Sequence, residues 1–334
     1  TMRARLERLP IGRRAALASL AGLACARLAR AQRGRPVRIG WLGWNGAAGT
    51  SASALALEAF RSELVARGWN FGRDLELLVR EGGRPQSEAL TTELVALDVQ
   101  LIVAIGPMVF GARTVSGARP LVFCINGDPV EAGLVSSLSR PGGTLTGVSA
   151  LSAELAGKRV ELLCEALRGG RRLAVVANEI HPGVGVEREA THAAARRLGA
   201  TIAWHPLKRS DDLNGAFAAI SRDGADGLIA IPDNLINQQA GRIAEFATAQ
   251  RLPTISGWAE FVEAGNLMSY GPDLRGYFRQ MAGIADRLLR GARPAELAIE
   301  QHRDVEFVVN TRTARTIGMA LPPALQLRVD RRVS

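Results

Sequence analysis

The sequence predicts an α/β protein with two doubly wound, Rossmann-like lobes. From Val37 onward, short apolar runs alternate with longer segments whose apolar residues recur at helical spacing. The alternation pauses at residues 126–149 and then starts again, which indicates a second α/β unit. A length of 334 residues is long for one core and sufficient for two.

In the first half, strands are expected at 37–42, 75–79, 101–105 and 121–125, and helices at 51–67, 86–97 and 111–116. The run at 101–105 is β-branched and is ended by Gly106 and Pro107. Buried strands separated by helices imply parallel βαβ units with right-handed crossovers.

Residues 126–149 are the most informative stretch. They are interpreted as the end of a strand, an Asp-Pro turn at Asp128, a short helix, a Pro-Gly-Gly turn and a new strand. In α/β proteins, ligands are bound at the carboxyl ends of strands. A chain that turns there and starts another strand can be crossing between lobes. The stretch therefore predicts both a ligand cleft and a hinge.

In the second half, Ser152 is a good N-cap for a helix at 152–167. Strands are expected at 173–177, 201–205, 227–231 and 253–256, and helices at 187–198, 212–221 and 236–250. The tail predicts a strand at 267–270, a helix at 273–290 capped by Asp273, a strand at 305–309 and a helix at 311–317. This surplus after two lobes indicates that the chain recrosses between them.

The net charge of +10 suggests a nucleic-acid binder at first. Residues 1–31, however, hold seven arginines against one acid, so this segment carries +6 and the remainder +4. The remainder has no lysine run and no basic stripe, so we expect no nucleic-acid partner.

Residues 1–31 are interpreted as a signal peptide, and the protein as periplasmic. A basic segment ending in Arg13-Arg14 precedes an apolar run at 15–26 and the small-x-small pattern at 29–31. The paired arginines favour twin-arginine export, with the general secretory route as an alternative. Two other interpretations are a lipoprotein modified at Cys25 and a buried N-terminal helix.

Few residues suggest chemistry. Gly40, Gly43 and Gly46 follow the first strand with spacing G-x-x-G-x-x-G, which differs from the dinucleotide fingerprint. Cys124 and Cys164 are predicted to be small core residues, and the histidines lack metal-ligand spacing. We therefore expect neither an enzyme nor a cofactor. His181, just after a strand, is placed to face a cleft.

Five strand ends carry polar or turn residues. They are Trp44 and Asn45, 106–108, 126–128, 178–181, and 232–234. Each could be a turn and nothing more. Their recurrence in both halves favours a ligand site instead.

The run "INGDPVEAGLVSSLSRPGGTLTGVSALSAELAGKRVELL", residues 125–163, resembles the signature region of ABC-transporter substrate-binding proteins related to tryptophan- and tyrosine-binding lipoproteins. "WAEFVEAGNLMSYGPDL", "LLRGARPAEL" and "FVVNTRTARTIGMALPP" continue the resemblance to the tail. The loop "GWNGAAGTS" departs from the short Gly-Ser-Pro type loop of relatives, which weakens any transfer of ligand identity.

The resemblance implies a type I periplasmic binding protein, with two lobes joined by three crossovers near 147–150, 269–271 and 299–303. The N-terminal lobe would comprise 36–148 and 271–299, and the C-terminal lobe 149–270 and 300–330. Such a protein closes on its ligand by hinge motion.

The expected function is solute capture for an ABC importer. The ligand would be a small molecule, either an amino acid or an aromatic or other organic compound; the partner would be an inner-membrane permease, and the protein would be a monomer. Trp44 is expected to stack on a flat ligand, and Asp128 to accept a hydrogen bond. The remaining candidate contacts are Asn45, Gly106, Pro107, Met108, Asn178, Asp233, Asn234 and Tyr270. A periplasmic sensor and a two-lobed nucleotide-dependent enzyme are the alternatives.

Overall fold

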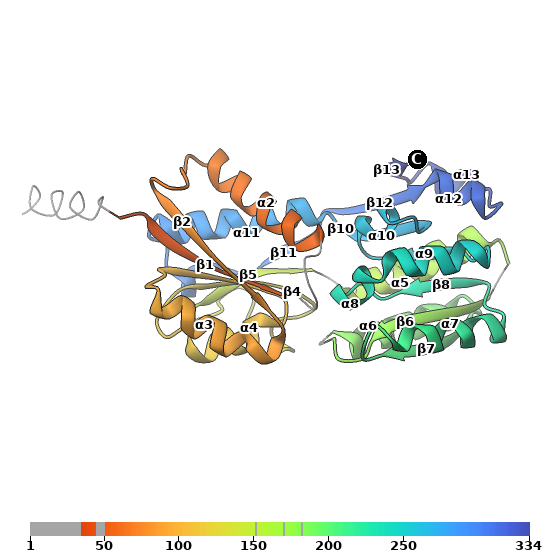
Figure 1. The fold of residues 1–334 in the computed structure, drawn as a ribbon, viewed down its shortest axis with the longest axis horizontal. Helices are drawn as coiled ribbons and strands as arrows, with labels where there is room; N and C mark the ends of the chain where they lie inside the picture. The colour runs from red at the N-terminus through yellow and green to blue at the C-terminus, as the bar shows by residue number, and fades with distance from the viewer. Residues whose placement is uncertain (1–34, 45–50, 151, 170, 182) are drawn as a thin grey trace, which may run out of the picture.

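The computed structural model describes residues 35–44, 51–150, 152–169, 171–181 and 183–334. These residues form two α/β lobes that lie end to end along the long axis of the molecule (Figure 1). The predicted signal peptide and the candidate residue Asn45 lie outside the described residues.

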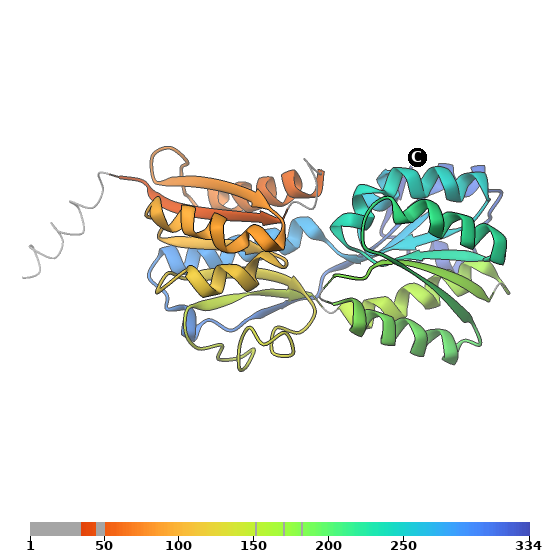
Figure 2. The same cartoon turned by 60° about the horizontal axis from the view of Figure 1, so that its bottom comes forward.

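The first lobe is built on a parallel sheet in the order β11-β5-β4-β3-β1-β2. Its strands are β1 (Val37–Trp44), β2 (Leu75–Gly82), β3 (Leu101–Ile105), β4 (Leu121–Asn126), β5 (Leu145–Ala150) and β11 (Glu300–His302). Helices α2 (Ser51–Ala66) and α11 (Leu274–Leu289) cover one face, and α3 (Ser87–Ala96) and α4 (Met108–Val115) cover the other (Figure 2). Helices on both faces explain why β3 and β4 are apolar along almost their whole length.

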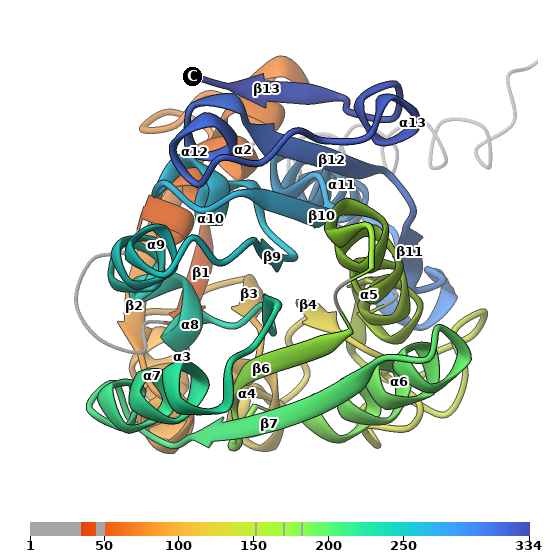
Figure 3. The same ribbon diagram turned by 90° about the vertical axis from the view of Figure 1, so that its right-hand side faces the viewer.

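The second lobe has a sheet in the order β13-β12-β10-β9-β8-β6-β7, in which only the β10–β12 pair is antiparallel among the described strands. Its strands are β6 (Arg172–Asn178), β7 (Thr201–Leu207), β8 (Gly227–Ala230), β9 (Thr254–Ser256), β10 (Met268–Pro272), β12 (Val305–Asn310) and β13 (Arg331–Val333). Helices α5 (Ser152–Leu167) and α6 (Val184–Arg197) pack on one face, and α7 (Asp212–Asp223) and α9 (Ala240–Ala249) on the other (Figure 3). Shorter elements are α8 (Asn234–Gln238), α10 (Ala259–Glu263), α12 (Thr311–Thr316) and α13 (Pro323–Gln326).

Each sheet contains one point at which the strand order reverses. In the first lobe the chain runs from β1 outward to β2 and then returns to β3 on the other side of β1. In the second lobe it runs from β6 outward to β7 and returns to β8. Helices diverge at such a point and leave a crevice at the carboxyl ends of the strands.

The chain passes between the two sheets three times. In the first passage, the chain leaves β5 of the first sheet and enters α5 of the second lobe. In the second, it leaves β10 of the second sheet and enters α11 of the first lobe. In the third, it runs from β11 of the first sheet to β12 of the second. The passages therefore follow Ala150, Pro272 and His302, two or three residues beyond the predicted divisions at 148, 270 and 299. Each strand continues to pair for these additional residues before it leaves its sheet.

Two local features shape the second passage. The Asp273 carboxylate accepts hydrogen bonds from the N–H groups of Arg275 and Gly276, both at 3.0 Å, which confirms the predicted cap of α11. At Gly271, a Cβ atom would lie 1.8 Å from the carbonyl oxygen of Gly257. Only glycine permits this close approach of two backbones.

Some predicted elements differ from the structure. The short helix expected after Asp128 is wrong: residues 128–134 form turns, and Gly133 there has a φ of 66°. The first turn is closed by a hydrogen bond from Ala132 N to Asp128 O, but the glycine conformation ends it. The helix expected at 111–116 starts earlier, at Met108, and the helix expected at 236–250 is divided into α8 and α9.

Cys124 and Cys164 are both buried and unbridged, so the prediction of core cysteines is confirmed. Among the described residues, no helix is both long and apolar enough to cross a membrane.

Candidate functional site

The two reversal points face each other across a cavity of about 540 Å³. Residues from both lobes line it, at the ends of β1, β3 and β4 on one side and of β8 and β9 on the other. Pockets that hold a small molecule have volumes of a few hundred to about a thousand Å³ and are mostly apolar with a few polar groups. The cavity fits this description in size and position.

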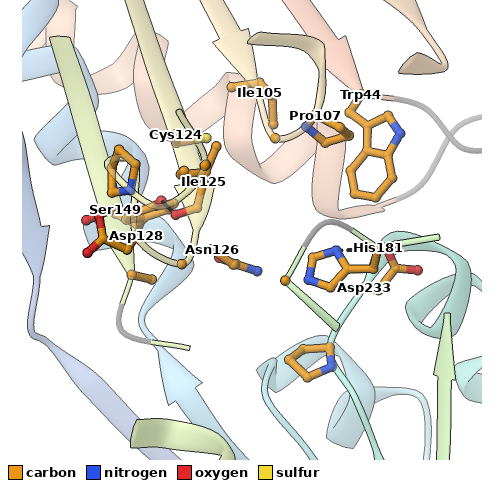
Figure 4. Close-up of a pocket in the computed structure, with 18 of the residues that line it drawn as sticks. Trp44, Ile105, Pro107, Cys124, Ile125, Asn126, Asp128, Ser149, His181 and Asp233 are labelled. Carbon is orange, nitrogen blue, oxygen red and sulfur yellow. Dashed lines mark hydrogen bonds and ion pairs between the residues drawn. The ribbon is translucent and has the colours of Figure 1, made fainter. Parts of the chain in front are cut away.

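The first-lobe wall is formed by Trp44 and by the turn after β3. Gly106 adopts a φ of 56°, and its N–H donates to the Cys124 carbonyl at 2.8 Å. A Cβ atom on Gly106 would lie 3.2 Å from the Trp44 indole, so glycine leaves room for the ring. Pro107 lies beside the indole, and both face the second lobe (Figure 4). The wall therefore offers a flat apolar surface.

A second part of this wall is the turn after β4. The Asp128 carboxylate accepts a hydrogen bond from Val130 N at 2.7 Å and is exposed at the cavity rim. Pro129 is buried beside it. Oδ1 of Asp128 thus stabilises the turn, and its other carboxylate oxygen remains available to a ligand.

Aromatic side chains form the inner end of the cavity on the first-lobe side. Tyr277 and Phe278 of α11 line it, and the Tyr277 hydroxyl lies within hydrogen-bond distance of the carbonyl oxygens of Ile125 (2.9 Å) and Val148 (3.1 Å). Burial raises the pKa of Tyr277 well above its ordinary value, so the hydroxyl stays protonated and acts as a donor. α11 is thereby tied to β4 and β5 next to the first passage between the lobes.

The second-lobe wall carries the polar groups. Asp233 caps α8: its Oδ1 accepts from Leu235 N at 2.7 Å and from Asn178 Nδ2 at 3.0 Å. Its Oδ2 is buried and receives no hydrogen bond from the described residues. The nearest cationic group is His181, whose Nδ1 lies 3.8 Å from that oxygen. Figure 4 shows the imidazole and the carboxylate together, opposite Trp44 and Pro107.

A buried ion pair lies behind this wall. Glu187 of α6 and Arg159 of α5 are 0% and 1% exposed, and Oε2 of Glu187 is 3.6 Å from Nη1 of Arg159. The other Glu187 oxygen is 3.8 Å from Nε2 of His181. Arg159 Nε donates to the carbonyl oxygen of Tyr270 in β10 at 2.9 Å. Charged side chains, each within 3.8 Å of the next, therefore extend from the cavity wall to β10, the strand that leads into the second passage.

Burial and charge act in opposite directions on the cavity-wall pair. Burial alone would lower the pKa of His181, but the carboxylates of Glu187 and Asp233 outweigh it and the pKa is raised. Burial raises the pKa of Asp233, although His181, Asn178 and the N–H of Leu235 oppose this rise. His181 therefore binds its proton between two buried carboxylates, those of Asp233 and Glu187.

One hydrogen bond joins the two walls directly among the described residues. Asn234 Nδ2, in the second lobe, donates to the carbonyl oxygen of Trp44 at 3.1 Å. The lobes also approach each other where a Cβ atom on Gly183 would lie 3.5 Å from the carbonyl oxygen of Asn126. The lobes are therefore in contact at the cavity and leave it partly enclosed.

The predicted site residues divide into two groups. The cavity is lined by Trp44, Gly106, Pro107, Asp128, Asp233 and Asn234. Met108 is fully buried in the core between α4 and the sheet, Asn178 lies behind Asp233, and Tyr270 packs edge-on against Phe307 with its ring centroid 6.4 Å away. Asn45 is outside the described residues.

Sequence reasoning identified Trp44 but missed other aromatic side chains of the lining. Trp258 follows β9, and this strand end could have been added to the five that were recognised. Tyr277 and Phe278 occupy positions on the apolar stripe of α11, where a cavity contact and a core contact look alike. Among the described residues, no group of His, Cys, Asp and Glu side chains is arranged to hold a metal ion.

Comparison with known proteins gives a family. The family model described as ABC transporter substrate binding protein matches residues 76–332. A curated relative, the tyrosine-binding protein of Clostridioides difficile, is 23% identical over 269 residues, which is 79% of this chain and 76% of the relative.

Solved structures give the same fold. The ABC domain from Streptococcus pneumoniae in complex with L-Trp is 20% identical, with 90% of this chain and all of that chain covered and a TM-score of 0.81. The 5-methylthioribose transporter solute binding protein from Thermotoga lettingae is 13% identical, with 87% and 96% covered and a TM-score of 0.61. The predicted fold class, that of type I periplasmic binding proteins, is confirmed.

Proposed function

The chain belongs to the family of ABC transporter substrate-binding proteins, and from this premise we propose that it is the extracytoplasmic solute-binding component of an ABC importer. It captures a small molecule in the cavity between the lobes and releases it to a permease in the inner membrane. The chain acts as a monomer, without a nucleic-acid partner.

The observation that carries this proposal is the position of the cavity. It lies where both sheets reverse their strand order, and it is lined from both lobes. Three passages of the chain connect the lobes next to it. A ligand that contacts both walls favours the closed arrangement, because it gains its contacts to the second wall only when the lobes approach.

The side chains that line the cavity favour an aromatic or other flat organic solute. Trp44 and Pro107 offer the apolar surface on which such a molecule stacks. Asp128, Asp233 and Asn234 supply polar contacts, while Asn178 orients Asp233. Relatives that bind tyrosine or L-Trp support the aromatic part of this proposal.

Binding takes place without a chemical step. Cys124 is the one thiol at the cavity among the described residues, and burial raises its pKa to about 12. A thiol with so high a pKa carries too little thiolate at neutral pH to act as a nucleophile. The lining thus supports recognition rather than catalysis.

Lobe closure and division are part of the proposal. The N-terminal lobe comprises the chain up to the first passage near Ala150 together with α11. The C-terminal lobe contains β6 to β10 and β12. The hydrogen bond from Asn234 to Trp44 O is a contact expected to form on closure and to break on opening. The exported state of the protein rests on the basic and apolar pattern of residues 1–31.

Native mass spectrometry of the purified protein, followed by denaturation and identification of the released small molecule, tests the proposed function. We expect a bound organic solute, and re-addition of that solute should raise the melting temperature, since it binds only the folded state. A protein that neither retains nor is stabilised by any small molecule from a periplasmic extract would contradict the proposal.

A further inference from the structure

The charged side chains around the cavity are mostly acidic. Those that the structure describes in its lining are the carboxylates of Asp128, Glu131, Glu154 and Asp233 and the imidazole of His181. This lining contains no lysine and no arginine. A ligand in the cavity therefore meets negative charge from both lobes.

Asp233 differs from the other three carboxylates because it is buried. It is 1% exposed, whereas Asp128, Glu131 and Glu154 are exposed at the rim. Its Oδ1 already accepts two hydrogen bonds, from Leu235 N and Asn178 Nδ2. Its Oδ2 accepts none from the described residues. Buried polar atoms are almost always paired in folded proteins. Nδ1 of His181 lies 3.8 Å from this oxygen, too far for a hydrogen bond, so a donor from a ligand would satisfy the oxygen.

The surrounding charges do not compensate Asp233 fully. Arg159 and Glu187 form a buried pair and cancel each other. Only a protonated His181 balances Asp233, and its ring nitrogens both lie without hydrogen-bond partners. Even with His181 protonated, Asp233 gains no hydrogen bond from it, and the lining still holds three further carboxylates with no lysine or arginine among its described residues. A positively charged donor from a ligand would pair with Asp233.

Three backbone N–H groups at helix starts beside the cavity are already paired within the chain. Helix N-termini commonly bind anions through free N–H groups. Here the N–H of Phe110 at the start of α4 donates to the Pro107 carbonyl, and that of Val184 at the start of α6 donates to the His181 carbonyl. At the start of α8, the N–H of Leu235 is taken by Asp233. At these three helix N-termini, the named N–H groups donate to acceptors within the chain and are not free to bind a ligand.

Resting on the proposed function, we infer that the solute is a cation: a flat apolar body that carries a protonated amine or amidine and no carboxylate. The cationic group pairs with the free oxygen of Asp233, and the flat body lies against Trp44 and Pro107. The exposed rim carboxylates attract such a molecule into the cleft. An amino acid brings a carboxylate for which the described lining provides no cationic partner.

Matched probes test this inference by isothermal titration of the full chain. One series is tryptamine, L-tryptophan and indole-3-propionate, and the second is phenethylamine, L-phenylalanine and 3-phenylpropionate. Within each series the apolar body is constant while the charge changes from cation to zwitterion to anion. We expect the amine to bind at least tenfold more tightly than the amino acid, and the acid to bind most weakly.

Asp233→Asn separates the charge from the fold. The amide retains an oxygen that accepts from Leu235 N and Asn178 Nδ2, so the cap of α8 persists. We expect at least tenfold weaker amine binding. Asp226→Asn is the matched control, because Asp226 also accepts from two backbone N–H groups, those of Arg171 and Arg172, but lies outside the cavity lining. Its amine affinity should equal that of the wild type.

Three results would overturn the inference: tighter binding of the amino acid or acid form, no binding of either amine at millimolar concentration, or unchanged amine affinity in Asp233→Asn. A zwitterionic or anionic solute released from the purified protein would also overturn it. That last result would leave the proposed solute-binding function standing, so the two proposals fail separately.

Discussion

At the scale of single residues, the most constrained group is the imidazole of His181. It is 8% exposed and lies within 3.8 Å of one oxygen each from Glu187 and Asp233. Arg159, behind Glu187, is the other charged group of this cluster. Since the two carboxylates raise its pKa despite burial, the folded protein binds a proton at His181 more tightly than the unfolded chain does.

His181→Gln should change how stability depends on pH. A group whose pKa is raised on folding contributes stability that is complete below its unfolded pKa, near 6.5, and is lost as pH rises through the folded pKa. The free energy of unfolding of the wild type should therefore exceed that of the variant most in mild acid, and the difference should shrink above pH 6.5. Urea unfolding at several pH values measures this, and a difference that grows with pH would be inconsistent with a protonated His181.

The location of the site could be predicted from the sequence better than the contacts within it. The strand-end rule placed Trp44, Pro107, Asp233 and Asn234 at one cavity, because parallel strands all end at the same edge of a sheet. It failed for Met108, because α4 begins at this residue and turns its side chain into the core. The direction of a side chain depends on where a helix starts, and this start is not visible in the sequence pattern.

At the scale of elements, Arg159 ties α5 to the strand that leads out of the second lobe. Its Nε donates to Tyr270 O in β10, and its Nη1 lies 3.6 Å from Glu187 in α6. Burial of the guanidinium disfavours its charged form, and Glu187 opposes this effect. Three elements therefore depend on one buried side chain next to the second passage between lobes.

Arg159→Met should lower the free energy of unfolding by about 3–5 kcal/mol, because it leaves Glu187 buried without its partner. Adding Glu187→Gln to this variant should restore part of the loss, since the uncompensated charge is then removed. The control is Arg197→Met, which breaks the exposed pair with Glu161 and should cost no more than about 1 kcal/mol. Chemical unfolding followed by circular dichroism measures all four proteins, and equal losses for Arg159→Met and Arg197→Met would contradict the structural role of Arg159.

Long helices such as α11 could be predicted from the sequence, whereas of the three-residue strands β9 was predicted and β11 and β13 were not. The stripe of α11 and its Asp273 cap were recognised, because a helix of this length repeats its apolar spacing several times. By contrast, β11 and β13 have three residues each, which is too short for any period to appear. β11 matters nonetheless, because its pairing with β5 holds the third passage against the first lobe.

At the scale of the whole molecule, two similar crevices face each other, and three passages of the chain connect the lobes that form them. Neither crevice encloses a ligand alone: the apolar surface comes from Trp44 and Pro107 in one lobe, and the buried charge from His181 and Asp233 in the other. Under the proposed function, recognition of a solute therefore depends on the approach of the lobes. The sequence could predict the two units, the recrossing and the strand ends that would face each other, but not the buried charges of Glu187 and Arg159 behind the second wall.

A crystal structure of the protein with its co-purified solute tests the central claim most directly. The account predicts solute density enclosed between Trp44 and Pro107 on one side and His181 and Asp233 on the other, in contact with both lobes. A solute bound elsewhere on the protein, with only water between these two walls, would contradict it.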